Sequence, residues 1–170
     1  MKRPSEQEYN PYYGGYVAQV PNGDIIQILE EQLASYLAFY QSIPASKWDY
    51  AYAPGKWTIK ELLLHLLDSE RVFSYRALRV ARGDSTPMPG FDQDLYVPNS
   101  KANKRSIASI IEEYQALRSS SIQLFKNFSA EMFDYLGTAS NSPVSVRALA
   151  YIISGHELHH AKIIKEKYLD

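Results

Sequence analysis

The sequence contains no cysteine among its 170 residues. This absence excludes disulfide bonds, thiolate metal ligands and a cysteine nucleophile. Any thiol that takes part in a reaction of this protein must therefore be a cosubstrate. A chain without cysteine also fits the reducing cytosol, so we expect a cytoplasmic protein.

Long apolar runs and an excess of one charge are missing as well. The longest apolar clusters, such as Leu62–Leu64, fall far short of the about 20 residues of a membrane-spanning helix. The first residues lack the apolar region of an export signal. Lys and Arg number 18 against 19 Asp and Glu, so no basic field attracts nucleic acid or an acidic membrane. We expect small molecules and protein partners instead.

Strand patterns and repeats are also lacking, whereas apolar residues recur at helical spacing almost throughout. The helical segments run from about Asp24 to Ile43, Thr58 to Arg82, Ser106 to Asn127, and Ser142 or Ser145 to Lys167. This pattern predicts an all-α four-helix bundle. We expect residues 1–170 to form a single domain that begins with an arm, residues 1–23.

A connection of about 20 residues, 84–104, separates the second helix from the third and is rich in Pro and Gly. Most connections in compact domains are shorter, so we expect either a crossover or a functional loop. One long connection is consistent with a bundle whose topology is not simply up and down.

The segment SGHELHH, residues 154–160, contains His156, Glu157 and His160 in the H-E-x-x-H spacing of zinc proteases. Both histidines fall in the middle of the apolar stripe of the fourth helix, while Glu157 and His159 fall at its two edges. Two imidazoles one turn apart can chelate one metal ion from a single helix face. The alternative is a pair of core histidines whose ring nitrogens bond to tyrosines or carbonyl groups.

A protease needs a third ligand beyond the motif, and only ten residues follow His160. Glu166 lies in the same helix and cannot fold back, so a zinc-protease site is not expected. A third ligand should come from upstream, where His65 is the only histidine. His65 interrupts a run of leucines, where a polar group is costly unless it has a partner.

The sequence resembles the DinB-like superfamily of metal-binding four-helix bundles. The resemblance rests on the order of the histidines and on residues 55–84, GKWTIKELLLHLLDSERVFSYRALRVARGD, residues 86–97, TPMPGFDQDLYV, and residues 144–168, VSVRALAYIISGHELHHAKIIKEKY. It implies that His65, His156 and His160 are the three metal ligands and that His159 is a neighbour. Relatives include thiol-dependent transferases, a maleylpyruvate isomerase and proteins described only as metal-dependent hydrolases. Dimerisation through helix faces is common among them, so we expect a homodimer.

Three neutral imidazoles would leave a divalent ion with open positions for water or substrate. Zinc or nickel suits such a site, since imidazole favours both ions. The ion could activate water for hydrolysis or bind a low-molecular-weight thiol for transfer to an electrophile. The expected function is therefore a metal-dependent hydrolase or thiol S-transferase, and the alternative is a metal-binding or structural bundle without catalysis.

Further side chains are weaker candidates. Asp68 lies one turn beyond His65 and could orient its free ring nitrogen, or could instead pair with Arg71 at the surface. Arg76 lies about 16 Å along the helix from His65 and could bind a substrate anion, although a salt bridge to Asp92 or Asp94 is the preferred interpretation. Glu157 is expected to be a polar edge residue of little consequence.

The arm before the first helix holds a cluster of tyrosines around Pro11: Tyr9, Tyr12, Tyr13 and Tyr16. We expect this segment to be irregular and to pack along the bundle, because tyrosines bury a large apolar area. Closure of the arm over the metal site is the functional alternative.

Overall fold

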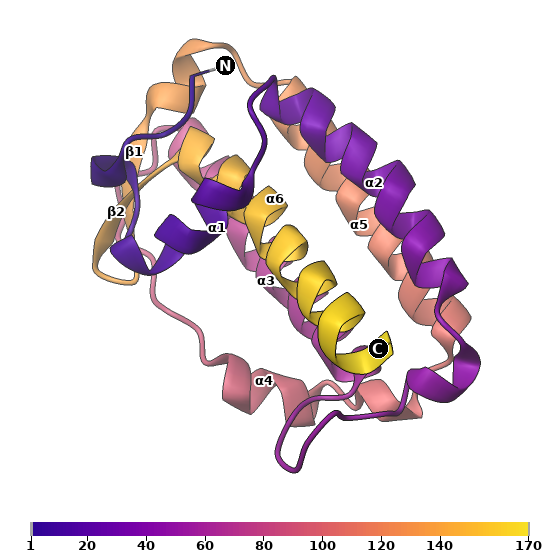
Figure 1. Ribbon diagram of the computed structural model, residues 1–170. Helices are drawn as coiled ribbons and strands as arrows, with labels where there is room; N and C mark the ends of the chain where they lie inside the picture. The colour runs from indigo at the N-terminus through magenta and orange to yellow at the C-terminus, as the bar shows by residue number, and fades with distance from the viewer. Residues whose placement is uncertain (1, 170) are drawn as a thin grey trace.

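The computed structural model describes residues 2–169, and within them four long helices form a bundle (Figure 1). The helices are α1 Gly14–Gln19, α2 Ile25–Ser42, α3 Ile59–Ala81, α4 Gln93–Asn99, α5 Ile107–Lys126 and α6 Val146–Ile163. The chain continues from α6 as a π-helical turn, η6 Ile164–Leu169. The strands are β1 Leu136–Ala139 and β2 Ser142–Ser145. Helices α2, α3, α5 and α6 are the predicted four, and the first three begin and end within one residue of the expected positions.

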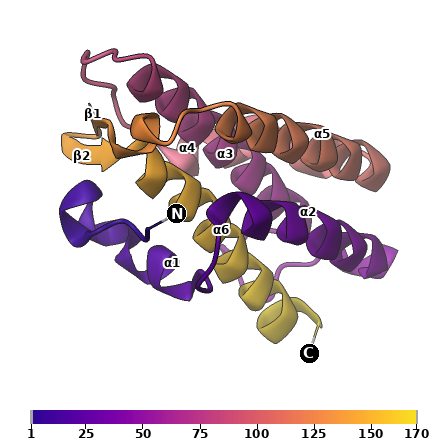
Figure 2. The ribbon, with the colours of Figure 1, turned by 90° about the horizontal axis from the view of Figure 1, so that it is seen from above.

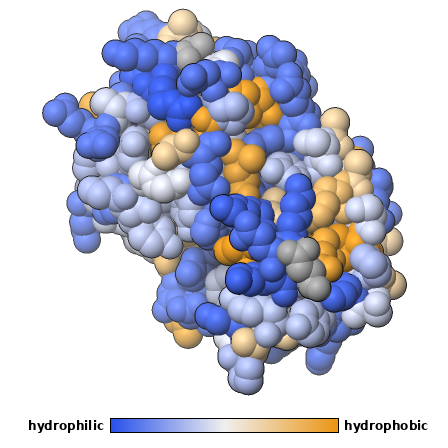
Figure 3. Space-filling view, viewed as in Figure 1, coloured by the Kyte–Doolittle hydropathy of each residue, from blue (hydrophilic) through white to orange (hydrophobic). Residues whose placement is uncertain are grey.

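The long helices pack in the order α2, α5, α3 and α6, and contacts between α6 and α2 close the ring. Figure 1 shows α2 beside α5 and α6 in front of α3, and Figure 2 shows the same helices from above. Helix α1 packs against the outer side of α6. In Figure 3 this face is mostly hydrophilic, with apolar residues in the strip between α6 and α2.

Side-chain caps fix where the long helices begin. The Thr58 hydroxyl accepts a hydrogen bond from the Glu61 amide, and the Glu61 carboxylate accepts one from the Thr58 amide. This is the predicted capping box, which pairs two amides at the start of α3. Ser106 and Ser145 cap α5 and α6 in the same way, through the amides three residues on.

The core consists of two apolar clusters, one toward each end of the bundle. Along α3, α5 and α6, buried polar residues separate the two clusters. These residues include Glu70, Arg118, His156, Glu157 and His160, and buried His65 lies next to them within the second cluster. Their burial is costly unless each has a partner, so this middle layer is where function should be sought.

Two expectations about the fold are wrong. Strands do occur: β1 and β2 pair antiparallel across a two-residue turn at Ser140 and Asn141, whose φ angles are 51° and 60°. The arm is not irregular, because it contains short 3-10 turns and α1. Both features are too short to leave a periodic apolar pattern, so tertiary packing decides them.

The long connection between α3 and α5 has structure of its own. It contains α4, whose first turn is capped by the Asp92 side chain. Before α4, the loop pairs with the hairpin: the Met88 amide donates to the Thr138 carbonyl, and the Ser140 amide donates to the Met88 carbonyl. The connection therefore ties the hairpin to the end of α3. No helix within residues 2–169 combines the length and hydropathy that crossing a membrane requires.

Candidate metal centre

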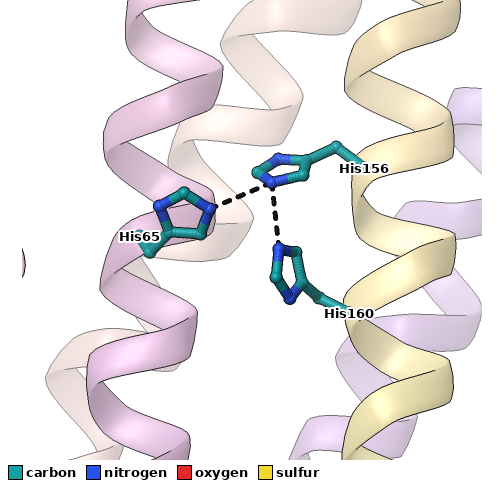
Figure 4. A group of neighbouring side chains, drawn as sticks. All are labelled: His65, His156 and His160. Atoms are coloured by element: carbon teal, nitrogen blue, oxygen red, sulfur yellow. Dashed lines mark hydrogen bonds between the residues drawn. The ribbon is translucent and has the colours of Figure 1, made fainter. Parts of the chain in front are cut away.

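His65 on α3 and His156 and His160 on α6 point toward one another in the middle of the bundle (Figure 4). The Nε2 atom of His156 lies 3.0 Å from the Nε2 atom of His65 and 3.0 Å from that of His160. All three side chains are buried. Zinc–nitrogen bonds of about 2.0–2.1 Å in a tetrahedron place neighbouring nitrogens about 3.3 Å apart, so the spacing fits one ion.

Hydrogen bonding among the rings does not account for this arrangement. The Nε2 atom of His156 is the shared partner of both short contacts, yet a ring nitrogen either donates one hydrogen or accepts through one lone pair. In addition, the Nδ1 atom of His160 is buried without a partner among the described residues. The interpretation as satisfied core histidines is therefore disfavoured, whereas a shared cation would use all three Nε2 lone pairs.

Burial keeps the three imidazoles neutral. It lowers the pKa of His65 to about 4. Burial, with smaller effects of His65 and His159, lowers the pKa of His160 to about 3. The pKa of His156 is also well below its usual value, because of burial and then the neighbouring histidines. Neutral rings are the form that binds a metal, so the site is competent at neutral pH.

Aromatic side chains surround the cluster. The Trp57 ring lies 4.9 Å from the His65 ring, and the Tyr16 ring lies 5.2 Å from the His156 ring, between centroids. Phe73 contacts His156 from a third side, at 6.2 Å. Tyr16 belongs to α1, so the arm packs along the bundle and also covers one side of the histidines.

A cavity of about 280 Å³ reaches the cluster at His160. Its walls include Trp57, Lys56 and Asp94, the last being an exposed residue of α4. The structure thus brings Asp94 to the opening of the site, where it can meet a small molecule. His159 lies on the partly exposed side of α6 beside Tyr16 and is not one of the three converging residues.

Glu157 is the residue that the sequence interpretation misjudged. It is 1% exposed, and its carboxylate accepts hydrogen bonds from Arg118 on α5, at 2.6 Å, and from the Tyr40 hydroxyl on α2, at 3.2 Å. Arg118 also binds Glu70 of α3 through three short contacts. Glu157 is therefore a buried ionic residue that holds α6 to two other helices directly beside His156. A signal was present in the sequence, because Arg118 lies on the apolar stripe of its helix, four residues from Tyr114 and from Ile122.

The other weak candidates are placed as follows. Asp68 is half-buried, lies 3.8 Å from Arg71 in an ion pair and makes no hydrogen bond to His65 among the contacts of residues 2–169. Arg76 donates to the Pro89 carbonyl at 2.7 Å and to the Ser140 hydroxyl at 3.1 Å. The preferred salt bridge from Arg76 to Asp92 or Asp94 is wrong for the described part of the chain, since Asp92 caps α4 and Asp94 lines the cavity beside His160.

Comparison with models of known protein families shows to which family the chain belongs. The model described as the DinB superfamily matches residues 28–164, which is most of the chain. The chain belongs to the DinB superfamily. The matched residues include the whole of α3, α5 and α6, and with them the three histidines.

One curated relative of this DinB chain and one solved structure with a similar fold carry hydrolase descriptions. A protein of Oceanobacillus iheyensis named "Putative metal-dependent hydrolase" is 27% identical over 116 residues, which cover 67% of this chain and 66% of that one, just under two thirds of its length. The structure of YfiT from Bacillus subtilis, described as "a probable metal-dependent hydrolase with an unusual four-helix bundle topology", has a TM-score of 0.72 at 17% identity. That superposition covers 97% of this chain and 90% of YfiT and shows a shared fold.

Proposed function

We propose that this DinB protein is a metal-dependent hydrolase whose divalent ion is held by His65, His156 and His160. The observation that carries the proposal is the convergence of three buried, neutral Nε2 atoms that hydrogen bonding cannot satisfy. Three protein ligands leave coordination positions open, which is typical of catalytic and not of structural sites. The hydrolase descriptions of the two relatives agree with this function. Zinc or nickel suits the nitrogen ligands.

A bound ion would supply an activated water near neutral pH or a polarised substrate oxygen. The chain itself contributes the rest. The cavity beside His160 admits a small substrate, and Asp94 at its rim can accept a proton from water that enters there. Trp57 and Tyr16 exclude bulk water from two sides of the histidines. The Glu157–Arg118 pair fixes the helix turn that carries His156.

Metal analysis of protein purified without a histidine tag tests the ligand set. We expect one zinc or nickel ion per chain in the wild type and loss of the ion in His65→Ala. His159→Ala is the matched control, because this histidine lies on the same helix outside the cluster and should leave the ion in place. An absence of metal above background in the wild type, or full metal content in His65→Ala, contradicts the proposal.

The reaction type needs a second experiment. Metal-loaded protein is supplied with ester and amide substrates in one series and with several thiols plus an electrophile in the other. We expect hydrolysis that a chelator abolishes and added metal restores. Turnover in the thiol series alone would instead assign an S-transferase, with the thiol as cosubstrate because the chain has no cysteine.

A further inference from the structure

A second buried arginine, Arg76, lies away from the histidines and lacks an acidic partner. It is 4% exposed, and none of the ion pairs among residues 2–169 involves it. Its polar neighbours are the Pro89 carbonyl and the Ser140 hydroxyl, both bonded to the same Nη2 atom, and the Tyr13 side chain. Arg118, by contrast, is buried with two carboxylates. The same bundle thus neutralises one buried guanidinium and leaves the other without a counter-charge.

An unpaired buried charge is expensive, since the neutral groups around it replace only part of its hydration. Arginine cannot relieve this cost by losing its proton at physiological pH. The Pro89 carbonyl, the Ser140 hydroxyl and the Tyr13 hydroxyl can accept from only three of the five N–H groups of the guanidinium. Arg76 therefore has donors left over for an anion.

A cavity of about 200 Å³ lies directly against Arg76. It is bounded by the arm, the β1–β2 hairpin, α3 and α6. One wall is apolar and is formed by Phe73, Leu149 and Ile152. Asn10, Ser140 and Ser142 add polar groups to the lining. A dry cavity of about 150 Å³ accepts benzene, so this space holds a small ring or short alkyl chain together with a charged group.

The turn of the β1–β2 hairpin helps to hold the Arg76 guanidinium in place. Ser140 occupies the left-handed region, φ 51°, where a residue other than glycine is uncommon. In this conformation its hydroxyl accepts from Arg76, while its amide donates to the Met88 carbonyl. The long connection and the hairpin thus converge on Arg76 from two sides, through Pro89 and Ser140.

We propose that this cavity binds a small organic carboxylate, with the carboxylate paired to Arg76 and the apolar part against Phe73, Leu149 and Ile152. The remaining N–H groups of the guanidinium can donate charge-assisted hydrogen bonds to a carboxylate. The apolar wall favours a ligand with a hydrocarbon body over inorganic phosphate. Phe73 also contacts His156, so the cavity lies one aromatic ring away from the histidine cluster. The binding site does not require a metal.

Titration with benzoate, and with benzamide as its neutral analogue of the same shape, tests the proposal. Binding is measured by calorimetry and by NMR of the Arg76 Nε–H signal, on wild-type protein treated with a chelator. We expect benzoate to bind and to shift the Arg76 signal, and benzamide to bind at least about tenfold more weakly, as loss of a charged hydrogen bond implies. Butyrate should resemble benzoate, and inorganic phosphate should bind more weakly than either.

Variants separate this site from the metal centre. Arg76→Gln should weaken benzoate binding about tenfold or more, while Arg82→Gln, an exposed arginine at the end of the same helix, should not. His65→Ala should bind benzoate as the wild type does, whether or not it holds metal. Should Arg76→Gln fail to fold, the comparison of benzoate with benzamide on the wild type decides. Equal binding of the two ligands, failure of both carboxylates to bind, stronger binding of phosphate, or a shift confined to the histidines would overturn the proposal.

Discussion

Arg118 carries a charge into the centre of the bundle, where its guanidinium bonds to Glu70 and Glu157 from two other helices. Two carboxylates share this one guanidinium, and burial raises the pKa of Glu157 above its usual value. This layer also links α3, α5 and α6 through side chains with fixed geometry. Arg118 therefore fixes the position of α3, which carries His65, relative to that of α6, which carries His156.

We expect Arg118→Ala to lower the free energy of unfolding by about 3–5 kcal/mol, because it leaves two buried carboxylates without their partner. Urea denaturation followed by circular dichroism measures this loss. Arg71→Ala is the matched control: that arginine also pairs with a glutamate, Glu113, but is exposed, so its loss should cost at most about 1 kcal/mol. Similar effects of the two substitutions would contradict the structural role of Arg118.

Residue roles were predicted from sequence only in part. The proximity of His65, His156 and His160 followed from the apolar stripes and from the count of histidines. The roles of Glu157 and Arg76 could not be predicted in this way. Each role depends on a partner in another element, and the sequence does not show which face of that element is turned toward the residue. Glu157 meets Arg118 across the bundle, and Arg76 meets a hairpin that leaves no periodic pattern. Helical spacing assigns a residue to a face, but it cannot identify the residue opposite.

At the scale of elements, the contact of α1 with α6 depends on Gly155. A Cβ atom at this position would lie 2.1 Å from the Tyr16 carbonyl oxygen, closer than any atom pair tolerates. The glycine next to His156 thus lets the arm approach the histidine cluster closely. This explains why the small residue stands in the middle of a buried helix, where glycine is otherwise destabilising.

We expect Gly155→Ala to displace α1 and to lower the free energy of unfolding by about 1–3 kcal/mol, as overpacking does. Limited proteolysis should then cleave the arm faster than in the wild type. Gly15→Ala is the control, because a Cβ there meets nothing within 4 Å and alanine favours a helix. Wild-type protease resistance in Gly155→Ala would contradict the close packing of α1.

A second anchor of the arm depends on pH. Burial alone would raise the pKa of Glu8, but hydrogen bonds from Arg147, the Ser5 amide and Ser145 lower it from 4.5 to about 2. The folded protein therefore holds this carboxylate ionised where the unfolded chain would protonate it. The stabilisation is complete above about pH 4.5 and is lost as the pH falls toward about 2.

In Glu8→Gln the free energy of unfolding should therefore fall less steeply between about pH 4.5 and about pH 2 than in the wild type. The arm of this variant should also be more sensitive to protease at neutral pH. Chemical denaturation at a series of pH values measures the first effect. The exposed Glu6 in the same turn provides the control substitution, Glu6→Gln. An unchanged acid limb in Glu8→Gln would show that the arm is held by other contacts.

The elements that could be predicted from the sequence are the long helices, in which apolar residues recur at helical spacing over several turns. Helices α2, α3 and α5 have about five turns or more and polar caps, so their bounds were visible. Helix α1 starts with Gly14–Gly15, which disfavour helix, and forms because α6 offers a surface. The hairpin turns at Ser140–Asn141 and not at the usual glycine pair, which removed the customary signal.

At the scale of the whole molecule, a bound ion should stabilise the fold. Metal at about 100 times its dissociation constant adds about 2.7 kcal/mol, which for a chain of this size corresponds to a rise of about 5–10 °C in Tm. Calorimetry with zinc, and then with excess chelator, should show this rise and its reversal. His159→Ala should respond as the wild type does, while a metal-induced rise of full size in His160→Ala would contradict the three-histidine set.

The positions of His65 and His156 differ by 91 residues, and the chain between them contains α4, α5 and the β1–β2 hairpin. An ion held by both would act as a reversible crosslink that closes a loop of more than half the sequence. Such a link reduces the conformational freedom of the unfolded chain, as a long-range disulfide does. Because the protein has no cysteine and cannot form a disulfide, a metal ion bound by these histidines would provide the long-range restraint that a disulfide provides in other proteins.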